Sequence, residues 1–189
     1  MDAFEQVVAE ILWLQGQWVR TSVKVDLNKE EKRKIGRPSS PRWELDIVAY
    51  SGRSNLLSVV ECKSYLDSFG VHAKGFNSKA PEASRYKLFN DAVLRETVFG
   101  RLKRQFYDAG FCPENPTIKL CLACGKIAEK SRASIGAHFL QNGWELWDET
   151  WLRKHLELIA KSGYENHASA VVSKLLLRGG LSKQAAVEG

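Results

Sequence analysis

Trp43-Glu44-Leu45-Asp46-Ile47-Val48-Ala49-Tyr50 is followed, after Ser51-Gly52-Arg53-Ser54-Asn55, by Leu57-Ser58-Val59-Val60-Glu61-Cys62-Lys63. The two outer runs are rich in β-branched and apolar residues, which favour strands, and the residues between them favour a turn. The sequence therefore predicts a β-hairpin. Because side chains alternate across a strand, Glu61 and Lys63 should project from one face, where the first strand can bring Asp46 beside them.

These three residues have the side-chain types of a metal-dependent phosphodiesterase site. Mg²⁺ prefers oxygen ligands and usually binds through one or two carboxylates and several waters, which fits Asp46 and Glu61. Lys63 can orient or help deprotonate a metal-bound water and offset charge on the phosphoryl oxygens. The alternative is structural: Asp46 caps or pairs locally, and Glu61 and Lys63 are the polar residues of a half-buried strand.

The order of elements resembles that of the PD-(D/E)XK nuclease superfamily, and within it archaeal Holliday-junction resolvases and Mrr-type restriction enzymes. The resemblance covers roughly residues 1 to 160. Besides the hairpin, it rests on an opening helix with an early glutamate and on Gly16, which precedes the strand beginning Trp18-Val19-Arg20. It also rests on Asn142-Gly143-Trp144-Glu145-Leu146-Trp147-Asp148, followed by Trp151-Leu152 and a helix.

The resemblance implies a nuclease that hydrolyses DNA phosphodiester bonds and leaves a 5′-phosphate, an endonuclease rather than an exonuclease. Asp46 and Glu61 would bind Mg²⁺, or Mn²⁺ in its place, together with the backbone carbonyl of Cys62. Lys63 would be the catalytic lysine. The sequence departs from the family pattern in having Leu45, not proline, before Asp46, and in a longer segment before Asp46 than compact resolvases have.

Glu5 is the residue that the resemblance places at the helix position completing the site. The first helix has apolar residues at helical spacing, and both Glu5 and Glu10 flank that stripe. The alternative is that both glutamates are solvated and that Glu5 merely suits the positive N-terminus of the helix.

Basic residues outnumber acidic ones, 28 to 22, and the pI is near 9.2, which permits a polyanionic partner such as DNA. Between residues 29 and 42 the sequence predicts a basic loop at the rim of the site, able to hold a phosphate backbone. Its cations are Lys29, Lys32, Arg33, Lys34, Arg37 and Arg42. The alternative is a solvated surface loop whose charge Glu30 and Glu31 partly cancel.

Further DNA contacts are predicted downstream. Residues 65–80 show little periodicity and contain Lys74, so they predict a mobile loop beside the site. Pro81 opens a predicted helix that reaches about Gly110, with Arg101 and Arg104 on its polar side. Such cations on an exposed helix are also common for solubility alone.

The remaining sequence alternates between strands and helices, which indicates an α/β fold: a restriction-endonuclease-like mixed central sheet flanked by helices. Strands are predicted at 117–124 and 144–147, and helices at 131–142, 149–161 and 164–177. We expect a nuclease-like domain over residues 1–162, an appended C-terminal helix over 163–180 and a tail over 181–189. The cysteines at 62, 112, 121 and 124 should be free thiols, with Cys62 packed in the core.

Length and hydrophobic content, 189 residues and 44%, are sufficient for one buried core. No apolar run approaches the roughly 18 residues of a membrane span, and no leader pattern opens the chain, so we expect a cytoplasmic protein without a membrane partner. A two-fold homodimer would be the simplest way to cut both DNA strands, although the residues define no interface. Two other functions stay open: a non-catalytic module that binds nucleic acid or a protein partner, and an enzyme acting on RNA.

Overall fold

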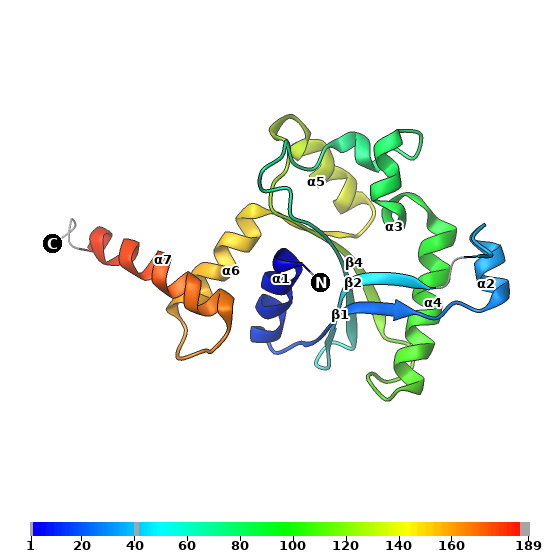
Figure 1. Cartoon of the computed structure of the whole chain (residues 1–189), viewed down its shortest axis with the longest axis horizontal. Helices are drawn as coiled ribbons and strands as arrows, with labels where there is room; N and C mark the ends of the chain where they lie inside the picture. The colour runs from blue at the N-terminus through cyan, green and yellow to red at the C-terminus, as the bar shows by residue number, and fades with distance from the viewer. Residues whose placement is uncertain (1, 40–41, 186–189) are drawn as a thin grey trace.

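A mixed sheet separates two layers of helices (Figure 1). The computed structural model describes residues 2–39 and 42–185. Strand order follows chain order: β1 (Trp18–Val25), β2 (Trp43–Ser51), β3 (Leu56–Lys63), β4 (Thr117–Cys124) and β5 (Glu145–Trp147). The first three strands are antiparallel neighbours, whereas β3, β4 and β5 are parallel. The predicted α/β class, with a mixed sheet between helices, is therefore confirmed.

The predicted hairpin is formed by β2 and β3. Their ladder runs from Ser51 opposite Leu56 to Ile47 opposite Val60. At the turn, Asn55 has a φ of 48°, a left-handed conformation that asparagine tolerates better than most residues. Both strands bury apolar side chains on each face, because helices cover both faces of the sheet.

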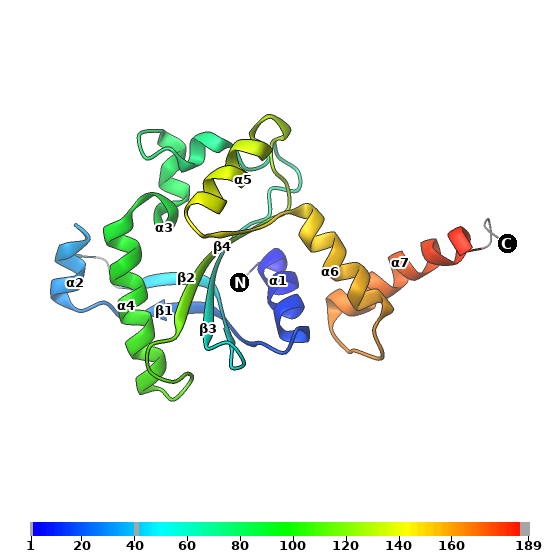
Figure 2. The ribbon, with the colours of Figure 1, turned by 180° about the vertical axis from the view of Figure 1, so that it is seen from behind.

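One face of the sheet is covered by α1 (Ala3–Leu14) and α6 (Glu149–Lys161), and α7 (Ala168–Ala185) packs outside them, mainly against α6, as Figure 2 also shows. Val8, Ile11 and Leu12 of α1 pack there with Ile47, Val60 and Cys121 of the sheet. Ala170 of α7 belongs to the same buried cluster, so the C-terminal helix shares this core. None of the helices in the described residues is long and apolar enough to cross a membrane.

The opposite face is covered by α3 (Lys87–Asn90), α4 (Ala92–Asp108) and α5 (Arg132–Gln141). Val98 and Leu102 of α4 and Phe139 of α5 bury themselves against Val48 and Leu57. Three short 3₁₀ turns, Ala73–Phe76, Pro81–Arg85 and Glu129–Ser131, lie in the connections. The remaining helix, α2 (Lys29–Lys34), lies beside α4 in Figures 1 and 2.

Several predicted elements need correction. The helix predicted from Pro81 to about Gly110 is broken into a 3₁₀ turn, α3 and α4, because the Asp91 side chain accepts from the backbone N–H of Leu94 and caps a new helix. The C-terminal helix begins later and ends later than predicted, at Ala168 and Ala185. Residues 181–185 are thus helical rather than a tail, and residues 186–189 lie outside the described residues.

The basic segment 29–42 is also not an irregular loop throughout. Residues 29–34 form α2, which has a capping box: Asn28 accepts from the N–H of Glu31, and Glu31 accepts from the N–H of Asn28. The prediction of a loop missed this cap. Ser40 and Pro41 of the predicted loop lie outside the described residues.

Residues 65–80, predicted to be a mobile loop, are anchored at two points. The backbone of Val71 donates to Lys126 and accepts from Ala128, both at 3.0 Å. Phe76 packs edge-on against Phe139, with ring centroids 5.0 Å apart. The segment is therefore fixed to the connection after β4 and to α5.

Candidate active site

Asp46 lies where the buried side chains of β2 switch from one face of the sheet to the other. Leu45 packs in one core cluster and Ile47 in the other, although strand alternation would place residues two apart on the same face. On β1, Ser22 falls between the partners of Ile47 and Leu45 and has a φ of 50°. Ser22 therefore lies opposite Asp46, and the β1–β2 register is the same on both sides of this irregular position.

The Asp46 carboxylate is held by the neighbouring strand. Its Oδ2 atom accepts a 2.7 Å hydrogen bond from the backbone N–H of Cys62. The regular β2–β3 ladder has its last pair at Ile47 and Val60, so this bond replaces a ladder hydrogen bond beyond that point. Asp46 is therefore attached directly to the strand that carries Glu61 and Lys63.

Glu61 and Lys63 form an ion pair on β3, with Nζ of Lys63 2.6 Å from Oε1 of Glu61. Their side chains are 22% and 20% exposed, so the pair is accessible at one edge but largely desolvated. The predicted proximity of these two residues is confirmed. Their positions two apart on one strand explain it, because both side chains project from the same face.

The charges of this cluster shift one another's pKa values. Burial raises the pKa of Glu61, and the attraction of Lys63 only partly offsets that, while Asp46 and Glu5 raise it further. For Lys63, burial lowers the pKa, but the carboxylate of Glu61 outweighs burial and the pKa ends above its ordinary value. Lys63 is thus a firmly protonated ammonium within a group of carboxylates.

Glu5 caps α1 and also interacts electrostatically with Asp46. It completes a capping box at the start of α1: its backbone N–H donates to Asp2 at 2.8 Å and its side chain accepts from the N–H of Asp2 at 3.2 Å. Its carboxyl also belongs electrostatically to the cluster, because burial raises its pKa and repulsion from Asp46 adds to the increase. The structure therefore brings Glu5, Asp46, Glu61 and Lys63 into one electrostatic group.

The donor types of this group suit a hard divalent cation. Asp46, Glu61 and Glu5 offer carboxylate oxygens against the single ammonium of Lys63, and their mutual repulsion is the kind that a bound cation relieves. Within residues 2–39 and 42–185, however, no set of three or more His, Cys, Asp and Glu side chains is already arranged around a metal position. A site here would rest on two carboxylates completed by water, which is the usual way Mg²⁺ is bound.

All four cysteines are free thiols and buried, as predicted. Cys62 packs in the cluster with α1, and burial raises the pKa of its thiol. Burial likewise raises the pKa of Cys124, to about 12, and of Cys121. Thiols kept protonated in this way are poor nucleophiles and poor metal ligands at neutral pH.

The predicted DNA-contacting cations lie in different parts of the fold: several on α2, Arg101 and Arg104 on α4, and Lys74 in the connection after β3. Figures 1 and 2 show α2, which carries Lys29, Lys32, Arg33 and Lys34, on the far side of the sheet from α1 and its Glu5. Lys29, Arg33 and Lys34 are exposed there. The cations of α2 are therefore not brought to α1, and the placement of the segment 29–42 at the rim of the site stays a prediction.

Most of the other predicted cations have partners within the protein. Arg101 pairs with Glu31 at 2.8 Å in a half-buried contact, and Arg104 adds to the positive field at the same carboxylate. Arg42 pairs with Asp26 at 2.8 Å, and Lys74 pairs with Glu82. The guanidinium of Arg37 lies 5.0 Å from the Trp43 ring centroid. These contacts give the residues structural roles that charge counting did not reveal.

Two residues near the cluster were missed by sequence reasoning. Tyr65 interacts electrostatically with Lys63 and forms a side-chain hydrogen bond with Tyr86. Tyr65 also has a φ of 42°, which is uncommon for a bulky residue and is often found at functional sites. Its position two residues after Lys63 was the only sequence signal.

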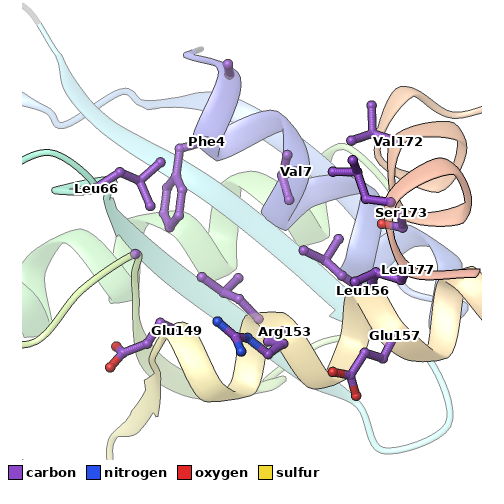
Figure 3. A pocket seen from close by; sticks show the side chains of 14 residues that line it. Phe4, Val7, Leu66, Glu149, Arg153, Leu156, Glu157, Val172, Ser173 and Leu177 are labelled. Atoms are coloured by element: carbon purple, nitrogen blue, oxygen red, sulfur yellow. The ribbon is translucent and has the colours of Figure 1, made fainter. Parts of the chain in front are cut away.

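An apolar groove of about 610 Å³ opens beside the cluster (Figure 3). Phe4 of α1 points into it next to Leu66, and α6 and α7 form its other walls with Leu156, Val172 and Leu177. Gly125, also in its lining, donates its N–H to the carbonyl of Lys63 at 3.1 Å, so the groove begins directly behind the end of β3. Charged side chains in its lining are restricted to α6: Glu149, Arg153 and Glu157.

Comparison of the chain with protein-family models, with curated proteins and with solved structures finds no match.

Proposed function

We propose that the chain is a Mg²⁺-dependent nuclease that hydrolyses DNA phosphodiester bonds, in the manner implied by its resemblance to the PD-(D/E)XK superfamily. One observation carries the proposal: the Glu61–Lys63 ion pair lies half-buried at the end of β3, and Asp46 is hydrogen-bonded to the residue between them. A half-buried group of carboxylates around one ammonium is costly for folding alone, which favours a functional reason for it.

Asp46 and Glu61, with the backbone carbonyl of Cys62, would hold the metal ion. When bound, Mg²⁺ would supply Lewis-acid stabilisation of the phosphoryl oxygens and lower the pKa of a coordinated water. The hydrogen bond from Cys62 orients the Asp46 carboxylate before substrate arrives. Glu5 would add a third carboxyl from α1, next to Asp46.

Lys63 acts in this proposal as a charged hydrogen-bond donor and not as a base. Its ammonium is held in the protonated state by Glu61, since the pKa of Lys63 lies above its ordinary value. A protonated lysine cannot accept a proton from water, but it can orient that water and stabilise charge developing on the phosphoryl group. DNA is the proposed partner, and a two-fold dimer is the simplest assembly for cutting both strands.

The test is cleavage of supercoiled, linear and branched DNA by purified protein with Mg²⁺ or Mn²⁺. We expect nicks or breaks that disappear with EDTA and in the Asp46→Asn and Lys63→Ala variants. Lys154→Ala, which removes an exposed lysine of α6, is the matched control and should cleave like the unmodified chain. Cleavage that persists in both site variants would refute the assignment.

A second candidate function is a module that binds a protein partner, and the apolar groove beside the cluster favours it. Val172 and Leu176 in its lining are 53% and 72% exposed, which is unusual for a face without a partner. The two functions are separated by metal titration: divalent-ion binding that is lost in Glu61→Gln supports the nuclease, whereas its absence in the unmodified chain supports the module.

A further inference from the structure

A small pocket of about 210 Å³ lies immediately beyond the proposed catalytic lysine. Its walls are mainly aromatic, from Tyr65, Phe69 and Tyr86, and the side chains of His72 and Arg85 are exposed at its edge. Tyr65 of its lining follows the end of β3 at Lys63 by two residues, which places this pocket next to the candidate active site. Glu82 also lines the pocket, but Lys74 pairs with it and compensates its negative charge.

The pocket is built on a fixed backbone. Gly70 has a φ of 83°, and a Cβ atom there would lie 2.8 Å from the carbonyl oxygen of Lys126, so this turn requires glycine. Gly75 lies against the ring of Tyr86, where a Cβ would approach to 2.6 Å. The side chain of Asn90 donates to the carbonyls of Gly75 at 2.8 Å and of Tyr86 at 3.1 Å, which joins the two walls.

Phe69 is the exception in this well-packed segment, because 86% of its surface is exposed. Ser68, next to it, donates its Oγ–H to the carbonyl of Tyr65 and accepts from the N–H of Gly70, so the backbone on both sides of Phe69 is held. An exposed phenylalanine on a restrained turn loses hydrophobic free energy and gains little conformational freedom. A planar aromatic ligand that stacks on the ring would recover the burial.

The chemistry of the pocket fits one nucleobase. Aromatic side chains stack on the π-face of any base, and nearby cations hold the attached phosphate, which is the common design of single-strand binding sites. Its volume is below the roughly 300–1,000 Å³ of pockets for drug-sized ligands, so it suits a single ring system. A base inside a duplex could not enter it without leaving the stack.

We propose that this pocket binds an unpaired nucleobase beside the scissile phosphate, so that the substrate class is DNA with a single-stranded segment. The inference deepens the proposed nuclease function and rests on it, because a scissile phosphate exists only if the chain cleaves DNA. Stacking on Phe69 and Tyr65 would fix the strand, and Arg85 and His72 would contact its phosphates. The preference for unpaired DNA would then come from the pocket, not from the metal-binding residues.

The test measures DNA binding in EDTA, so that it does not depend on cleavage. Three labelled probes of equal length are compared: a single strand, a blunt duplex, and a forked duplex with 2-aminopurine in its unpaired arm. We expect the single strand and the fork to bind more tightly than the duplex, and the 2-aminopurine fluorescence to be quenched on binding. Phe69→Ala should weaken binding of the single strand by about 5- to 150-fold, the range for one stacked base.

Tyr164→Ala is the matched control, because Tyr164 is 89% exposed and lies in the connection between α6 and α7. It should leave binding and quenching unchanged. Arg85→Ala should weaken binding without abolishing the quenching, which separates phosphate contact from stacking. Since Phe69 is almost fully exposed, its replacement should not alter the thermal unfolding temperature.

Equal affinity for the three probes, or unchanged quenching in Phe69→Ala, would overturn the pocket assignment. The result is independent of the nuclease proposal. Preference for unpaired DNA without cleavage in Mg²⁺ would support the base pocket and refute the nuclease. Cleavage of duplex and forked DNA alike, with no quenching, would support the nuclease and refute the base pocket.

Discussion

The backbone N–H of Cys62 donates a 2.7 Å hydrogen bond to Oδ2 of Asp46, across two strands whose regular ladder has its last pair at Ile47 and Val60. A side chain here takes the place of a backbone acceptor. The same carboxylate repels Glu5 and Glu61 and raises the pKa of both. Asp46 therefore links the architecture of the hairpin to the electrostatics of the candidate site.

Substitutions at Asp46 should separate the effect of its hydrogen bond from the effect of its charge. Asp46→Asn keeps an oxygen that can accept from Cys62 and removes the negative charge, so its free energy of unfolding should stay within about 1 kcal/mol of the unmodified chain. Asp46→Ala leaves the N–H of Cys62 without this acceptor and should cost about 1–3 kcal/mol. Urea denaturation measures both values, and Mg²⁺-dependent DNA cleavage should be lost in both variants. Equal stability of the two variants would show that the hydrogen bond contributes little.

The hairpin itself could be predicted from the sequence because alternation and turn residues are local signals. The ion pair of Glu61 and Lys63 follows from the same alternation. The orientation of Asp46 could not be predicted, because it depends on an irregularity opposite Ser22 on another strand. The position of Glu5 depends on how α1 packs across the sheet, for which only the family resemblance gave a signal.

Lys63→Met should lower the rate of DNA cleavage by roughly 10²- to 10³-fold, the usual effect of removing one donor that stabilises developing charge. It should also destabilise the fold, because the half-buried Glu61 loses the ammonium that partly offsets its desolvation. The double variant Glu61→Gln/Lys63→Met should regain most of that stability while staying inactive. A double-mutant cycle in urea measures the coupling, and additive effects would show that the pair contributes no interaction energy.

The stability of the chain should depend on pH through Glu61. Its pKa in the folded state is raised above 4.5, so the folded state binds this proton more tightly than the unfolded state does. The contribution is complete below 4.5 and is lost as pH rises through the higher folded value. The free energy of unfolding should therefore fall with rising pH relative to Glu61→Gln, when both are measured from acidic to neutral pH.

Arg101 and Arg104 offer a direct comparison of a structural and an exposed cation. Arg101 is bound to Glu31, 70 positions away in sequence, so Arg101→Ala should lower the free energy of unfolding by about 1–3 kcal/mol. Its effect on DNA affinity should be small. Local patterns cannot show such a long-range pair, which is why the sequence predicted a DNA contact. A filter-binding assay and urea denaturation of Arg101→Ala and Arg104→Ala check this, and a larger loss of DNA affinity than of stability in Arg101→Ala would contradict it.

The attachment of α7 depends on Glu10, whose side chain accepts hydrogen bonds from both the N–H, at 3.0 Å, and the hydroxyl of Ser169. Burial raises the pKa of Glu10, but these bonds outweigh burial and bring it below 4.5. Its contribution to stability is therefore present above pH 4.5 and is lost as pH falls through the lower folded value.

Ser169→Ala should remove one of these bonds and weaken the docking of α7 by about 1–3 kcal/mol, because a bond to a charged acceptor is stronger than a neutral one. Protection from hydrogen exchange, corrected for the intrinsic exchange rate at each pH, should fall in α7 before the sheet is affected, and it should fall in the unmodified chain as well when the pH drops below 4.5. Ser134→Ala, which removes an exposed hydroxyl of α5, should change neither. If α7 and the sheet exchanged together in Ser169→Ala, the helix would belong to the cooperative core formed through Ala170, and Glu10 would not control its attachment separately.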